Sequence, residues 1–124
     1  MNNFYIDSDD NEFINNLFDV DITNSIIDGN QNIEFLIEKL GDTNLDYKLS
    51  NSLIKFNDIN DYFDNNPIYD FSNNLHYENL FQNLSPGFIN AVNNDLRINQ
   101  NSEIIGLGSL EFATQTPFDI LNNN

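Results

Sequence analysis

The chain has 124 residues and carries 20 acidic against 4 basic residues, which gives a formal net charge of −16 at pH 7. Leu, Ile, Val and Phe make up about a third of the residues, so a chain of this charge still has enough apolar side chain to fold. The sequence contains no cysteine, which excludes disulfide frameworks, thiolate zinc sites and thiol nucleophiles.

The charges and the N-terminal sequence also exclude classes of partner and compartment. The first ten residues, MNNFYIDSDD, lack the basic and apolar regions of a secretory signal, and no apolar run approaches the roughly 18 residues of a membrane span. Direct binding to nucleic acid or to an anionic membrane needs clustered cations, whereas Lys39, Lys48, Lys55 and Arg97 are far apart in the sequence. We therefore expect a cytoplasmic protein that binds neither nucleic acid nor membranes directly.

The first third of the chain predicts a short strand followed by two helices. Residues 3–6 form a short apolar segment ahead of an acidic turn. Asp9 and Glu12 have the spacing of a capping box, and a helical apolar stripe follows, formed by Phe13, Ile14, Leu17 and Phe18. Asn30 and Gly41 are placed to cap the two ends of a second helix, whose apolar positions are Ile33, Leu36, Ile37 and Leu40.

The middle of the chain allows two interpretations, and its later part predicts more helix. Residues 45–56 alternate as in a hairpin, but residues 45–63 also fit a helical period. Ser72 is expected to cap a third helix with Leu75, Leu80, Phe81 and Leu84, and Ser85 with Pro86 a fourth with Ile89, Val92 and Leu96. Residues 103–113 indicate a late strand or an irregular buried segment, and residues 122–124 a frayed end.

These elements predict a single α+β domain over residues 1–124, mainly helical, with a small antiparallel sheet or hairpin. We find no internal repeat at a fixed period in the sequence.

Two stretches have part of the pattern of a carboxylate metal site. Asp7 and Asp9 follow a short apolar segment, an arrangement in which two carboxylates can share one divalent cation. The run from Asp42 offers ligands at the odd positions of a calcium loop, but Tyr47 stands where that loop needs glycine and Leu53 where it needs glutamate. We expect no metal and no cofactor, and metal binding is kept as a third hypothesis.

Acidic residues are concentrated in the first two thirds of the chain. Residues 1–78 hold 16 acids and three lysines, whereas residues 79–124 hold four acids and one arginine. Asp58, Asp61 and Asp64 recur every three residues, which on a helix gives a carboxylate about every 4.5 Å along one side. Duplex DNA presents a comparable row, with one negative charge per about 1.7 Å of its axis.

The leading hypothesis is therefore a non-enzymatic inhibitor that binds a basic protein, such as a nuclease or another nucleic-acid-binding effector, and blocks its DNA or RNA site. Phage anti-restriction and anti-CRISPR inhibitors and nuclease immunity proteins act by this logic, and the likeness is one of charge and size. The partner-binding residues are expected to be Asp7, Asp9, Asp10, Glu12, Asp19, Asp21, Asp58, Asp61, Asp64 and Asp70, with Tyr62, Phe63 and Tyr69 as aromatic anchors. The alternative is a structural or accessory subunit of a larger assembly that its acidic surface keeps soluble. The oligomeric state stays open.

Overall fold

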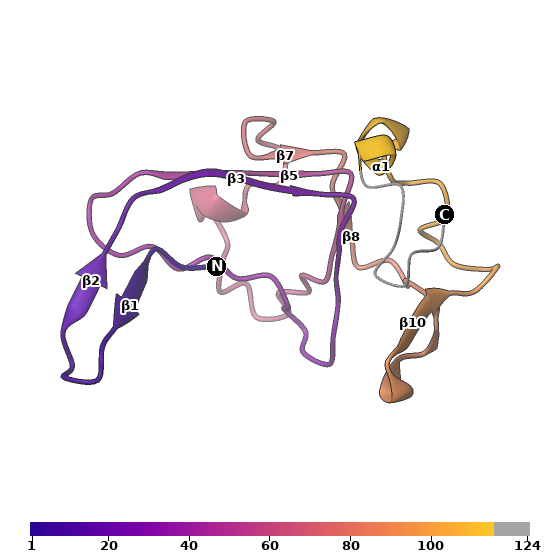
Figure 1. Cartoon of the computed structure of the whole chain (residues 1–124), viewed down its shortest axis with the longest axis horizontal. Helices are drawn as coiled ribbons and strands as arrows, with labels where there is room; N and C mark the ends of the chain where they lie inside the picture. The colour runs from indigo at the N-terminus through magenta and orange to yellow at the C-terminus, as the bar shows by residue number, and fades with distance from the viewer. Residues whose placement is uncertain (116–124) are drawn as a thin grey trace.

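The computed structural model describes residues 1–115, and within them strands predominate (Figure 1). The strands are β1 (Phe4–Ile6), β2 (Glu12–Ile14), β3 (Leu17–Thr23), β4 (Ile26–Ile27), β5 (Leu45–Ser50), β6 (Leu53–Ile54), β7 (Tyr77–Glu78), β8 (Phe81–Gln82), β9 (Phe88–Asn90) and β10 (Asp95–Ile98). The described residues contain one α-helix, α1 (Leu110–Gln115), and two short 3-10 helices, η1 (Pro67–Tyr69) and η2 (Ala91–Asn93). The prediction of a mainly helical domain is therefore wrong. The frayed end predicted at residues 122–124 lies outside the described residues.

The body of the molecule is a short solenoid of parallel strands. Strands β3, β5 and β7 form one sheet and β4, β6 and β8 a second, and every neighbouring pair in both sheets is parallel. A coil is one strand of the first sheet, the strand of the second sheet that follows it, and the segment that returns to the first sheet: β3 and β4 belong to the first coil, β5 and β6 to the second, and β7 and β8 to the third. Val20 of the first coil is in register with Tyr47 of the second, and Leu49 of the second is in register with Tyr77 of the third. The chain thus stacks each coil on the previous one at a nearly constant interval, a repeat that the sequence did not reveal.

An asparagine forms the corner of each coil, between the strand of one sheet and the strand of the other. Asn24, Asn51 and Asn79 occupy these corners with φ values of 47°, 50° and 49°. This left-handed conformation is sterically costly for most residues, and asparagine is one of the few that tolerate it. The corner residue is therefore dictated by backbone geometry.

Asparagine side chains also join segments that are distant in sequence, because a carboxamide can bond a backbone peptide in two directions. The Asn83 amide donates to the Phe56 carbonyl (2.9 Å) and accepts from the Phe56 N–H (2.8 Å). Asn24 makes the same pair of bonds with Ser109, and Asn3 with Leu40. A carboxylate cannot donate, so aspartate could not replace asparagine at these positions.

The core lies inside the second coil, between its strands and the segments that return from one coil to the next. Tyr47, Leu49 and Ile54 of β5 and β6 are buried there, as is Tyr77 of β7. The Tyr47 and Tyr77 hydroxyl oxygens lie 3.0 Å apart, and both hydroxyls donate to the Ile68 carbonyl. Burial raises the pKa of both phenols above the ordinary value, that of Tyr77 most strongly.

Two antiparallel hairpins flank the solenoid, β1 with β2 and β9 with β10, and Figure 1 shows them at opposite ends of the molecule. Both expose large apolar side chains, among them Tyr5, Phe13, Ile89 and Leu96. None of the helices in the described residues is long and apolar enough to cross a membrane.

The predicted helices are strands and extended segments in the structure. Phe35 and Ile37 are buried while Leu36 between them is 43% exposed, so residues 35–38 alternate with a period of two, and the expected helix over 30–41 is absent. Gly41 does take a left-handed φ of 70°, but it ends no helix. The helix expected from Asp9 is the β1–β2 turn followed by β2 and β3, and those expected from Ser72 and Ser85 are β7 with β8 and β9 with β10.

The region of residues 45–63 agrees with neither sequence interpretation in full. Its alternating part is a strand, β5, and the chain turns at Asn51 as a hairpin would. The next strand, β6, pairs with β4 and β8 and not with β5, so the two form a coil corner instead of a hairpin. The segment from 103 to 109 is irregular and leads into α1.

Candidate functional site

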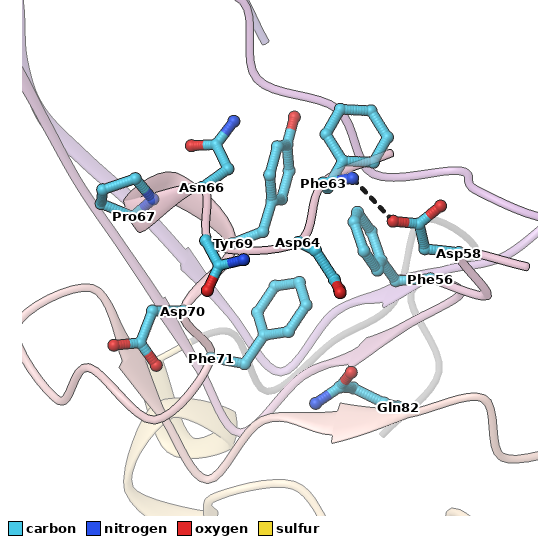
Figure 2. Close-up of a pocket in the computed structure, with 11 residues that line it drawn as sticks. Phe56, Asp58, Phe63, Asp64, Asn66, Pro67, Tyr69, Asp70, Phe71 and Gln82 are labelled. Atoms are coloured by element: carbon cyan, nitrogen blue, oxygen red, sulfur yellow. Dashed lines mark hydrogen bonds between the residues drawn. The ribbon is translucent and has the colours of Figure 1, made fainter. Parts of the chain in front are cut away.

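An open pocket of about 630 Å³ collects several of the predicted partner-binding residues (Figure 2). It lies where the chain leaves β6 and returns towards β7, over residues 56–71, with Gln82 of β8 at one side. Its lining residues are Phe56, Asp58, Phe63, Asp64, Asn65, Asn66, Pro67, Tyr69, Asp70, Phe71 and Gln82. None of these lining residues, all within the described part of the chain, is Lys, Arg or His.

Four aromatic rings form the base of the pocket. Phe56 stacks on Tyr69 with ring centroids 5.0 Å apart and meets the edge of Phe71 at the same distance. Phe63 meets the edge of Tyr69 at 4.6 Å. The Tyr69 hydroxyl accepts from the Ile37 N–H (3.0 Å) and donates to the Ile37 carbonyl (3.2 Å), which ties the pocket to the preceding coil. The aromatic base is thus continuous with the core, to which Phe56 and Tyr69 belong.

Three carboxylates, those of Asp58, Asp64 and Asp70, line the pocket around these rings. Asp58 is half-buried and accepts hydrogen bonds from the backbone N–H groups of Tyr62 (3.1 Å) and Phe63 (2.8 Å). Asp70 accepts from the Ser72 N–H at 3.1 Å and from its hydroxyl. Asp64 is exposed, and its carboxylate makes no hydrogen bond within the described residues. The turn bonds fix two of the carboxylates and leave oxygen lone pairs of all three for a ligand.

The predicted row of Asp58, Asp61 and Asp64 does not exist as a helical face. These residues lie in successive turns, with backbone hydrogen bonds from Asp61 N to Asp58 O and from Asp64 N to Asp61 O, each 3.4 Å long. Asp61 has a φ of 56° and does not line the pocket. The expected regular spacing of carboxylates along a helix is therefore wrong, although two of the three aspartates share one pocket.

The three predicted aromatic anchors differ in their exposure and in their position relative to the pocket. Tyr62 is 77% exposed and lies outside the pocket, Phe63 is half-buried in its base, and Tyr69 is buried. Sequence reasoning missed Phe56, Phe71, Asn65, Asn66 and Gln82. The available signal was the interleaving of aromatic residues and acids between residues 56 and 71.

The remaining predicted residues lie on two other elements. Asp7, Asp9, Asp10 and Glu12 belong to the β1–β2 hairpin, and Asp19 and Asp21 to β3. The Asp7 carboxylate accepts from the side chain and backbone of Asn11 and from the Asp9 N–H, and these bonds lower the pKa of Asp7. Within the described residues no group of three or more His, Cys, Asp or Glu side chains is placed to hold a metal ion.

The charges of the described residues are arranged so that the acids face solvent and most cations are paired. Every Asp and Glu in residues 1–115 is exposed or half-buried. Lys48 pairs with Glu78, Lys55 with Asp28 at 3.8 Å, and Arg97 with Asp95 at 2.7 Å. Lys39 is exposed and forms no ion pair within this part of the chain. The surface therefore has a large excess of uncompensated carboxylates.

Comparison of the sequence with protein-family models and with curated proteins, and of the structure with solved structures, finds no match.

Proposed function

We propose that this chain is a non-enzymatic binding protein whose partner is a strongly basic protein, and that it acts by occupying the partner's nucleic-acid site. The observation that carries the proposal is the pocket over residues 56–71, where Asp58, Asp64 and Asp70 surround an aromatic base with no cation among the lining residues. A cationic side chain from a partner would supply the missing positive charge.

An arginine side chain suits this chemistry best. Its planar guanidinium binds carboxylates through paired hydrogen bonds, and the same plane stacks on aromatic rings. The Asn66 and Gln82 side chains at the pocket add neutral acceptors. The excess of surface carboxylates would attract a basic partner from a distance and speed the encounter.

The fold does not explain why so many of these residues are charged. Asp58 and Asp70 bond backbone N–H groups in turns, but Asn66, Asn73 and Asn99 make the same kind of bond with an uncharged side chain. Asparagine would therefore serve the turns without the mutual repulsion that a net charge of −16 produces. Retention of the carboxylates supports a role for the charge in binding.

The test compares two charge reversals in the full chain. Asp64→Lys changes a pocket carboxylate that has no hydrogen bond to lose, and Asp42→Lys makes the same change at an exposed acid outside the pocket. Binding to an arginine-rich peptide and to a basic nuclease is measured by fluorescence anisotropy over a range of salt concentrations, with duplex DNA as competitor. We expect Asp64→Lys to weaken binding by about tenfold or more and Asp42→Lys by less than about threefold.

Two outcomes contradict the proposal. Equal losses from the two reversals would indicate bulk attraction without a site. Binding to the nuclease that is indifferent to salt and to DNA would exclude occupation of a nucleic-acid site.

A second candidate function is that of an accessory subunit in a larger assembly. It is favoured by the apolar side chains on the two flanking hairpins, including Tyr5, Ile6 and Phe13 on one and Ile89 and Val92 on the other. Monomeric proteins seldom expose contiguous apolar patches of large size. Purification from the native host would distinguish the two functions, because a large assembly supports the subunit and a basic nuclease supports the inhibitor.

A further inference from the structure

Strand β3 is the open edge of the first parallel sheet. Its neighbour on one side is β5, and no described strand pairs with its other side. The Asn24 N–H bonds the Ser50 carbonyl at the end of β5. Because alternate residues of a strand point their backbone groups to opposite sides, Asp21 points its N–H and carbonyl away from β5. These groups are available to another strand.

The interior of the first coil is only partly covered. Val20 of β3 is half-buried, whereas Tyr47, its register partner on β5, is 3% exposed. Ile22 of β3 is half-buried, whereas Leu49 beside it is fully buried. A strand added alongside β3 would cover Val20 and Ile22 as β3 covers Tyr47 and Leu49 of β5.

The charges on β3 indicate which side chains a strand added beside it would have. Asp19 and Asp21 are exposed, and Lys48, the register partner of Asp21 on β5, pairs with Glu78 of β7 instead. Carboxylates facing outward from an edge strand favour a cation on the strand that joins it. A second copy of this chain, joined edge to edge, would bring its own Asp19 and Asp21 to the same edge, which disfavours self-pairing.

We propose that an extended segment of the partner, in which basic residues alternate with apolar ones, adds to β3 as a further strand. Its apolar residues lie over Val20 and Ile22, and its basic residues lie beside Asp21 and near Asp19, which is at the irregularity that precedes the regular part of β3. This inference rests on the proposed function, since it takes the partner to be basic, and it names the form in which part of that partner binds.

The test uses a peptide of alternating Lys and Val as the probe, with an alternating Glu and Val peptide as control. Amide hydrogen exchange of the full chain is followed by NMR. We expect the Lys–Val peptide to slow exchange of the Asp21 amide by about tenfold or more. The Ile22 amide, which points towards β5, should change little, and the Glu–Val peptide should protect neither.

Three variants separate charge from backbone pairing. Asp21→Asn removes the charge and is expected to weaken Lys–Val peptide binding by about two- to fivefold, whereas Asp46→Asn on β5 removes the same charge with little effect. Asp21→Pro removes the outward N–H without a loss of pairing to β5 and is expected to weaken binding at least about tenfold.

Each failure has a distinct meaning. If basic peptides and proteins bind in a salt-dependent way but leave the Asp21 amide unprotected, strand addition is wrong and the proposed function stands. If no basic probe binds, the proposed function fails as well. A dimer of the free chain that Asp21→Pro abolishes would assign the edge to a second copy and overturn the inference.

Discussion

Replacement of Tyr69 by phenylalanine tests whether the Tyr69 hydroxyl holds two coils together. The hydroxyl accepts from the Ile37 N–H and donates to the Ile37 carbonyl, and both residues are buried. Phenylalanine fills nearly the same space, so water gains no room to replace the oxygen. A buried donor or acceptor left without a partner costs about 1–3 kcal/mol. With one of each left unsatisfied, we expect a loss of about 2–4 kcal/mol in the free energy of unfolding.

The measurement is urea unfolding followed by circular dichroism, with thermal unfolding beside it. For a chain of this length the loss corresponds to a fall in Tm of about 8–16 °C. Tyr62→Phe is the matched control, because the Tyr62 side chain is exposed and its hydroxyl makes no hydrogen bond within the described residues. If the two variants lose the same stability, the bridge to Ile37 contributes nothing and the reasoning fails. Because the ring at the pocket is kept, peptide binding by folded Tyr69→Phe should stay within about twofold of the parent.

Three further predictions follow from the coil corners and the shifted pKa values. Asn51→Ala is expected to lower the free energy of unfolding by about 1–2 kcal/mol, because alanine disfavours the left-handed conformation, and Asn51→Gly by less than about 1 kcal/mol; equal losses in urea unfolding would contradict this account. Burial raises the pKa of Tyr77 above its ordinary 10.0, so stability is full below that pH and falls as pH rises above it, because the unfolded chain ionises first. With Tyr77→Phe, Tm should fall less steeply as pH rises above that value, and an unchanged slope of Tm against pH would refute the prediction. Hydrogen bonds from Asn11 lower the pKa of Asp7 below 3.8, so its contribution is present above that pH and lost as pH falls through the lower value; an NMR titration midpoint for Asp7 at or above 3.8 would exclude these bonds.

The sequence predicted some local structure correctly. The strand predicted within residues 3–6 is β1, Phe4–Ile6, and the alternation of Leu45, Tyr47 and Leu49, on which one of the two open interpretations rested, is that of β5. The alternation in β5 has a period of two, which needs only a few residues to be recognised. The turn at Asn51 was also visible, because asparagine is common in turns.

The helix predictions failed because short strands and corners can imitate a helical period. Phe13, Ile14, Leu17 and Phe18 fit one helical face, yet they lie on two strands separated by Asn15 and Asn16. Each corner shifts the phase of the alternation, so apolar residues on successive short strands fall three or four positions apart. Pairing between coils, which decides the outcome, joins residues a whole coil apart in the sequence and has no local signal.

The repeat escaped detection for a related reason. The inward positions accept apolar residues of different shape, as Ile22, Leu49 and Tyr77 show in one column. The column of Asn24, Asn51 and Asn79 is invariant, but about a fifth of all residues are asparagine, which hides it. In the described residues every non-glycine residue with positive φ is Asn or Asp, so part of this bias has a conformational cause.

The candidate site was predicted in part. Asp58, Asp64, Asp70, Phe63 and Tyr69 meet at one pocket, as the density of acids and aromatic residues in this segment suggested. Their geometry was beyond reach of the sequence, because it depends on consecutive turns and not on a helix.

The corner asparagines give successive coils the same corner, so that coils can be added to the stack as equal units. Strand pairing, the inward apolar column and the corner have the same form on both sides of the second coil. An inserted segment that duplicates residues 45–72 would therefore find compatible partners above and below. Such a molecule would be longer by one coil along the stacking axis, and its two hairpins would keep their present contacts. The fold is therefore a scaffold that can be lengthened by whole coils.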